Sequence, residues 1–127
     1  MLIYPALDPA ATGRVIVNDE EIPVLTRASM DWLWDMYARS KADWQDPYFA
    51  PLKAQSLANL APAFIVVAAY DPLCDETHEY AERLSAAGVE CRVSHHSDMI
   101  HGFLSINMID RCNELIMDIG AHLKAVL

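Results

Sequence analysis

The sequence predicts an α/β fold in which parallel strands alternate with flanking helices. Three observations favour this class. An apolar run covers residues 63–69, a helical pattern ending in glycine follows at 75–88, and an alternating segment at 90–94 precedes a long apolar stripe. A strand, a helix and a second strand of these lengths form a right-handed parallel unit.

The N-terminal part is expected to hold one short strand and one helix. The strand runs from Leu2 to Pro5 and is apolar. Ser29 can cap a helix, whose apolar face is formed at helical spacing by Met30, Leu33, Trp34 and Tyr37. Residues 43–51 are rich in aromatic side chains and proline, which predicts an ordered loop.

The middle of the chain carries the clearest strand and helix signals. Residues 63–69 are continuously apolar and partly β-branched, as in a parallel strand buried on both faces. Asp75, Glu76 and Glu79 place negative charge where a helix N-terminus favours it. Gly88 then supplies a C-terminal stop for that helix.

A second strand and a last helix complete the pattern. Residues 90–94 alternate like a strand, and residues 95–103 are expected to form a loop. The last helix has one apolar stripe, made of Leu115, Ile116, Ile119, Leu123 and Val126. Because no repeat, low-complexity tract or linker interrupts the chain, residues 1–127 are expected to form a single unit.

Composition narrows the partners and the compartment. The net charge is −9 with nine Lys and Arg, which disfavours nucleic acid and anionic membranes. The longest apolar run, residues 61–70, is far shorter than the ~20 residues that span a bilayer. Three widely spaced cysteines fit reduced thiols, and no secretory signal is visible at the N-terminus. These features predict a cytoplasmic protein without a membrane span.

The candidate chemistry lies where the two predicted strands end. In open parallel sheets the functional residues lie outside the carboxyl ends of the strands. Asp71 follows the first of these strands and His101 follows the second. A carboxylate beside a histidine can hold the imidazole in one tautomer and stabilise its cation. Two other interpretations stay open, namely that Asp71 only caps the following helix, as Asp75 could, and that His101 lies on a surface loop.

Several strings, taken in order, resemble the esterases related to hormone-sensitive lipase, which have the α/β-hydrolase fold. They are Tyr4-Pro5-Ala6-Leu7-Asp8, Leu60-Ala61-Pro62-Ala63, Asp71-Pro72-Leu73-Cys74-Asp75-Glu76, Ala87-Gly88-Val89 and His101-Gly102-Phe103. The resemblance covers essentially the whole chain. It implies hydrolysis of small-molecule carboxylic esters through an acyl-serine intermediate, without cofactor or metal, with Asp71 as the triad acid and His101 as the general base.

The sequence departs from that family in two respects. None of its seven serines lies in a Gly-x-Ser-x-Gly elbow, and no His-Gly-Gly stretch offers oxyanion-hole amides. In the family both lie upstream, so the resemblance implies that this chain holds the sixth to eighth strands of the sheet. We therefore expect an esterase fragment that is inactive alone. The alternatives are a non-catalytic dimeric module, or an enzyme in which Asp71 and His101 serve Cys74 or Ser97.

Three further expectations concern other residues. The group of His95, His96, Asp98 and His101 has no zinc-type spacing, so no metal is predicted there. Six aromatic residues are candidates for a substrate pocket or for core packing, namely Trp32, Trp34, Tyr37, Trp44, Tyr48 and Phe49. An unpaired edge on the strand from Leu2 to Pro5 predicts a homodimer through that edge.

Overall fold

A computed structural model describes residues 1–11, 24–106 and 108–126 and contains one three-stranded parallel sheet. The strand order is β1 (Leu2–Ile3), β2 (Ala63–Tyr70) and β3 (Cys91–Ile100), with β2 in the centre. Residues 64–68 of β2 are at most 1% exposed. The predicted α/β class and the parallel sheet are confirmed, because a central strand covered on both faces has to be apolar throughout.

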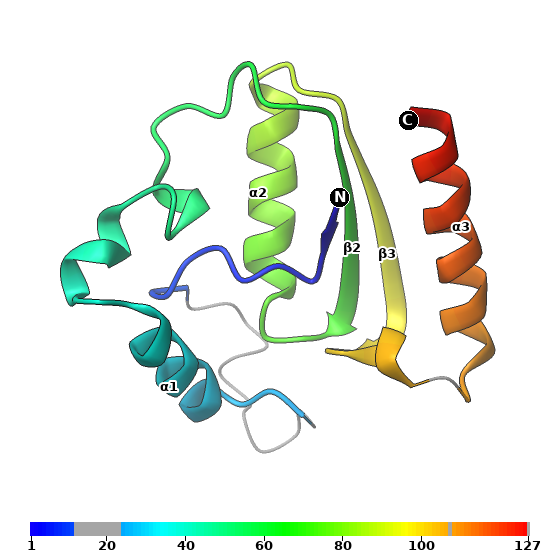
Figure 1. Cartoon of the computed structure of the whole chain (residues 1–127), viewed down its shortest axis with the longest axis horizontal. Helices are drawn as coiled ribbons and strands as arrows, with labels where there is room; N and C mark the ends of the chain where they lie inside the picture. The colour runs from blue at the N-terminus through cyan, green and yellow to red at the C-terminus, as the bar shows by residue number, and fades with distance from the viewer. Residues whose placement is uncertain (12–23, 107, 127) are drawn as a thin grey trace.

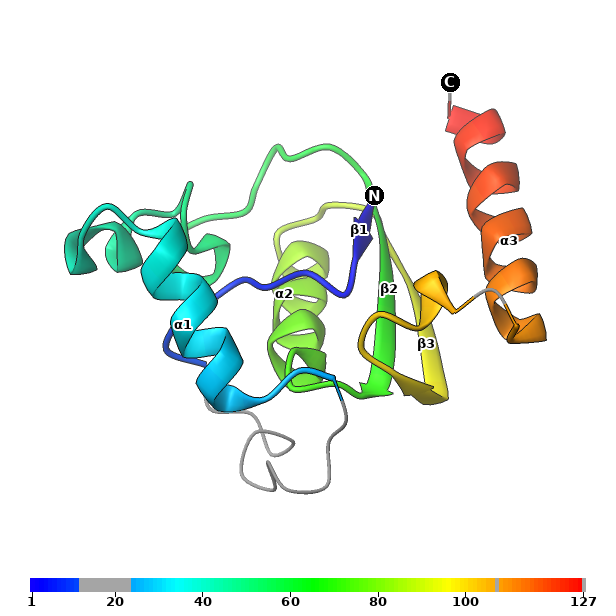
Figure 2. The same ribbon diagram turned by 60° about the horizontal axis from the view of Figure 1, so that its bottom comes forward.

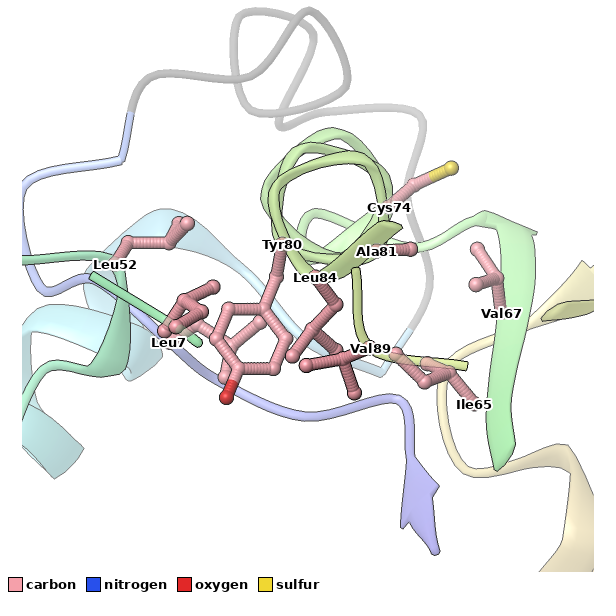
Figure 3. Packing of buried hydrophobic residues seen from close by; sticks show 10 residues of the cluster. Leu7, Leu52, Ile65, Val67, Cys74, Tyr80, Ala81, Leu84 and Val89 are labelled. Carbon is pink, nitrogen blue, oxygen red and sulfur yellow. The ribbon is translucent and has the colours of Figure 1, made fainter. Parts of the chain in front are cut away.

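Two helices cover the two faces of this sheet, as Figure 1 shows. On one face, α2 (Cys74–Ala86) packs on Ile65 and Val67 of β2. Figure 3 shows these side chains pointing toward Ala81 and Leu84 of α2. On the other face, α3 (Asp110–Val126) packs its buried side chains on β2 and on the short helix η4 (Phe103–Ser105). The core therefore has two layers, one on each side of β2.

A third helix lies on the same side of the sheet as α2. Figure 2 shows these two helices on one side of the sheet and α3 on the opposite side. This helix, α1 (Arg27–Tyr37), begins after Thr26 rather than at the predicted cap Ser29. The two residues form a capping box, since the Ser29 N–H donates to Thr26 Oγ1 and the Thr26 N–H donates to Ser29 Oγ. Ser29 thus does cap the helix, but from its third position.

Two short 3₁₀ helices occupy part of the segment that was expected to be an ordered loop. They are η2 (Lys41–Gln45) and η3 (Pro51–Lys53). Pro51 begins η3, where its missing N–H costs no hydrogen bond. These turns bring Leu52 into the core beneath α2.

The ends of α2 follow the sequence signals closely. Asp75 and Glu76 lie in its first turn, where the helix dipole favours negative charge. At its C-terminus the Val89 N–H donates to Leu84 O and the Gly88 N–H donates to Ser85 O. This is a Schellman motif, in which Gly88 takes the left-handed conformation at φ +77°.

The second predicted strand is longer than expected. Residues 95–100, expected to be a loop, continue β3 up to Ile100. The register changes there, because Ala68 pairs with His96 whereas Tyr70 pairs with Ile100. β3 therefore contains a bulge, which absorbs extra residues and bends the strand. The polar side chains in this part of β3 are tolerated because most of them are exposed.

The apolar stripe of α3 is only partly buried. Leu115 is 1% exposed, whereas Ile116 is 52% and Leu123 is 37% exposed. Ile119 packs on the core, and the side chain of Val126 lies outside the described residues. No helix among the described residues has both the length and the apolar character needed to cross a bilayer. Within the described chain, none of the three cysteines is in a disulfide.

Candidate active site

Asp71 is held in place by the turn that joins β2 to α2. The side chain is 1% exposed, and its Oδ1 accepts a hydrogen bond from the Leu73 N–H at 2.9 Å. Its other oxygen, Oδ2, lies 2.8 Å from His101 Nδ1. The predicted hydrogen bond between Asp71 and His101 is therefore present. Because Oδ1 also fastens the turn that precedes α2, Asp71 combines a local structural contact with the contact to the histidine.

His101 reaches Asp71 because of the backbone around it. The bulge in β3 directly precedes it, and Gly102 follows with φ +77°. The left-handed conformation at Gly102 turns the chain sharply into η4. The His101 side chain is 23% exposed. Since Nδ1 binds Asp71, Nε2 is the ring nitrogen left for proton transfer.

Tyr4 forms one wall of the histidine site. Its ring lies 4.8 Å from that of His101 and 6.0 Å from that of Phe103, between centroids. Burial raises the pKa of the Tyr4 phenol. The Tyr4 backbone has φ +33°, which is uncommon outside glycine, and its N–H donates to Val66 O at 2.9 Å. We did not predict Tyr4 as a site residue from the sequence, although its position at the end of a strand is a usable signal.

An apolar cavity of about 460 Å³ opens beside His101. Its lining residues come from the segment after β1, from α1 and the residue range just before it, from the segment around η3, from the start of α2 and from the end of β3. They are Tyr4, Ala6, Leu25, Met30, Leu33, Trp34, Tyr37, Phe49, Pro51, Leu73 and His101. A mostly apolar cavity with a few polar groups is typical of small-molecule sites.

The six aromatic residues singled out in the sequence divide into two groups. Trp34, Tyr37 and Phe49 line the cavity and contact one another, with Tyr37 and Phe49 stacked at 5.0 Å between ring centroids. The other three are not among its lining residues. Of these, Tyr48 is 97% exposed and Trp44 packs on the cluster of Met30, Trp34 and Leu73.

Glu76 links two segments next to the site through a buried hydrogen bond. Its side chain is 4% exposed, and Oε1 accepts a hydrogen bond from the Leu7 N–H at 2.6 Å. This bond ties the segment after β1 to α2, the helix that follows Asp71. Oε2 has no hydrogen-bond partner among the described residues. Burial raises the pKa of Glu76 to about 7.

The histidines near the site do not form one cluster. His96 pairs with Ala68 in the sheet, bonds Ser94 Oγ and packs its ring on Phe103, on the α3 side. Asp98 forms an exposed ion pair with Arg111 at 3.9 Å. His95 lies beside His78 of α2, with ring nitrogens 3.1 Å apart. The four residues that the sequence analysis considered together are thus dispersed, and of these four only His101 reaches Asp71.

Comparisons with known proteins agree with this fold. The family model described as the alpha/beta hydrolase fold matches residues 1–105. The carboxylic ester hydrolase LipN of Mycobacterium tuberculosis is 39% identical over 98% of this chain and 35% of its own length. The ethyl acetate hydrolase of Pseudomonas putida is 30% identical over 95% of this chain and 39% of its own length.

The solved structures include an esterase of Pyrobaculum calidifontis, which superposes with a TM-score of 0.90. It is 31% identical, over 98% of this chain and 42% of its own. The chain spans 35% and 39% of the two curated relatives named above. It belongs to the α/β-hydrolase-fold family, in the group of esterases related to hormone-sensitive lipase.

Proposed function

We propose that the chain contributes the acid and the base of a carboxylic ester hydrolase, with Asp71 and His101 in these roles. One observation carries the proposal. A buried carboxylate lies 2.8 Å from Nδ1 of a half-buried histidine, at the edge of an apolar cavity. An orienting acid and a general base need this arrangement, with the substrate in a site sheltered from water.

In the proposed mechanism His101 Nε2 removes the proton of the attacking hydroxyl group. The same nitrogen then returns that proton to the leaving alkoxide, while Asp71 stabilises the imidazolium. The cavity would hold the apolar part of the ester against Trp34 and Phe49. We further propose that the nucleophilic serine and the oxyanion hole come from residues outside these 127, because no serine here lies in a Gly-x-Ser-x-Gly elbow.

The substrate class rests on the relatives. Two of the relatives are named as a carboxylic ester hydrolase and an ethyl acetate hydrolase. By this likeness we propose a small carboxylic ester as the substrate. We also keep the prediction that the protein works in the cytoplasm, which its three thiols outside any disulfide support.

A first experiment measures hydrolysis of a nitrophenyl ester by the purified 127-residue chain. We expect the rate to equal the background, because a base without a positioned nucleophile and oxyanion hole supplies no acyl transfer. Turnover that is lost in His101→Ala and blocked by a serine-directed phosphonate would refute the missing nucleophile.

A second experiment tests the roles of the acid and the base directly. In it, this chain replaces the matching part of the Pyrobaculum calidifontis esterase, and folding is verified by thermal melting. We expect an active chimera in which His101→Ala or Asp71→Asn lowers kcat by roughly 10⁴-fold or more. His122→Ala is the matched control, since that histidine packs on Phe64. A folded, active chimera that tolerates His101→Ala would refute the proposal.

The rival function is a non-catalytic module that associates through β1. Among the described residues β1 pairs with β2 only, so its other edge has no strand partner there. An open apolar edge is a template for a further strand. We propose that two copies pair their segments from Leu2 to Pro5 antiparallel about a two-fold axis. Sedimentation at micromolar concentration should give a dimer that Ile3→Lys dissociates, and a stable monomer would exclude it.

A further inference from the structure

Three metal-ligating side chains meet on the α2 side of the sheet, away from the pair of Asp71 and His101. They are Cys74 and His78 of α2 and His95 of β3, and their ligand atoms all lie within 4.8 Å of one another. His78 Nε2 is 3.1 Å from His95 Nδ1. The geometry points to a binding site for Zn²⁺ or a similar borderline divalent cation.

The two secondary-structure elements present these ligands in a fixed way. Cys74 and His78 are four residues apart on α2, so they lie one helical turn apart on the same face. His95 pairs with Val67 across the sheet, and Val67 packs with Cys74 in the core between β2 and α2. The register therefore turns His95 toward α2. In Figure 3 the sulfur of Cys74 points away from Leu7 and Leu52.

The spacing of the ligand atoms suits a tetrahedral ion. With bonds of about 2.0–2.3 Å to nitrogen and sulfur, two ligand atoms of a zinc ion are roughly 3.3–3.7 Å apart. The two ring nitrogens, 3.1 Å apart, are slightly closer than this, and an ion bound by both would take the place of the hydrogen bond between them. The ligand atoms now lie up to 4.8 Å apart, and small rotations of the side chains would bring them to the separation that the ion needs.

The burial of the three ligands leaves a route for the ion. Cys74 is buried, His78 is half-buried and His95 is exposed, so the site opens toward solvent past His95. A solvent molecule can complete a tetrahedron from that side. One thiolate with two imidazoles favours Zn²⁺ or Co²⁺ over Mg²⁺ and Ca²⁺, which prefer oxygen ligands. The net charge of −9 also favours a bound cation.

A metal ion here would connect the two segments that carry Asp71 and His101. Cys74 lies three residues after Asp71, and His95 lies six residues before His101. An ion that joins α2 to β3 would therefore stabilise the pairing on which the histidine position depends. Metal that binds only the folded chain also raises its melting temperature.

The site can be tested with Co²⁺ as a spectroscopic probe, on the reduced, chelator-treated chain. We expect tetrahedral Co²⁺ absorption with a thiolate charge-transfer band, displacement by Zn²⁺, and no response to Mg²⁺. Cys74→Ser should abolish the charge-transfer band. His78→Ala and His95→Ala should each weaken binding at least tenfold.

Two matched variants serve as controls. His96→Ala changes the neighbouring histidine on the opposite face of β3, and Cys91→Ser changes a second thiol on the same strand. Both should leave Co²⁺ affinity within twofold of the unmodified chain. Because His95 is exposed, His95→Ala should keep the fold even if Cys74→Ser does not. A chain that gives no charge-transfer band, or one whose affinity survives His95→Ala, would overturn the site.

Discussion

Two glycines allow a quantitative test of how the backbone positions the site. Gly88 ends α2 and Gly102 follows His101, and both have φ +77°. A Cβ atom built on either glycine meets no heavy atom within 4 Å. Gly88→Ala and Gly102→Ala therefore introduce the same conformational strain with no steric clash.

The size of the effect follows from these two conditions. A left-handed conformation costs an L-residue roughly 1–2 kcal/mol. Alanine also restricts the unfolded chain, which offsets about 0.4–1 kcal/mol of this cost. From the midpoints of these ranges, the net loss in free energy of unfolding should be about 0.8 kcal/mol for each variant, between limits of about 0 and 1.6 kcal/mol. A loss of about 1 kcal/mol lowers the Tm by roughly 3–6 °C in a chain of this length.

Urea unfolding followed by circular dichroism measures these losses, with Gly120→Ala as the control. Gly120 lies within α3, and a Cβ there also meets nothing within 4 Å. Because Gly120 lacks the positive φ, its replacement should instead stabilise by roughly 0.5–1 kcal/mol. If Gly88→Ala or Gly102→Ala stabilised like Gly120→Ala, or if the first two differed by more than about 1.5 kcal/mol, the backbone argument would be wrong.

The same assay checks three further predictions. Leu115→Ala removes a side chain that is 1% exposed between α3 and β2, so it should lower the free energy of unfolding by about 2–5 kcal/mol. Its control is Met117→Ala, at a position that is 74% exposed, which should change the free energy of unfolding by less than about 0.5 kcal/mol. Glu76→Ala deprives the Leu7 N–H of its acceptor and should cost about 1–3 kcal/mol, with Glu76→Gln costing less if the retained carbonyl oxygen keeps that bond. Thr26→Ala breaks the capping box of α1 and should cost about 1 kcal/mol, and no measurable loss would contradict the cap.

The elements that the sequence predicted well are those with local signals. The apolar run in β2, the acidic start of α2 and its glycine stop are each visible within a few residues. The strand-end positions of Asp71 and His101 likewise follow from the order of the elements, and the expected hydrogen bond between them is present. Their roles in catalysis, and the organisation of the chain as a single unit, stay predictions.

The features that escaped prediction depend on tertiary context. The polar residues 95–98 do not show the apolar pattern of a strand, yet all four lie within β3, where His95 and His96 pair with β2 and all but His96 are exposed. The bulge that precedes and positions His101 cannot be recognised from the pattern of hydrophobic residues. The grouping of Cys74, His78 and His95 was not predicted either, because two of these residues lie on a helix and the third is on a strand in another part of the sequence.

The docking of β3 on β2 also determines the order in which the site forms. Asp71 is bound to Leu73, two residues away in the chain, so its side chain is positioned as soon as this turn folds. It meets His101 across 30 residues, and that loop closes only when β3 has docked on β2. Asp71 thus belongs to the core, while His101 directly follows a strand with many exposed side chains. In native-state hydrogen exchange, the amides of β3 should therefore exchange faster than those of β2. The contact between Asp71 and His101 would then be lost by local unfolding while the core is still folded.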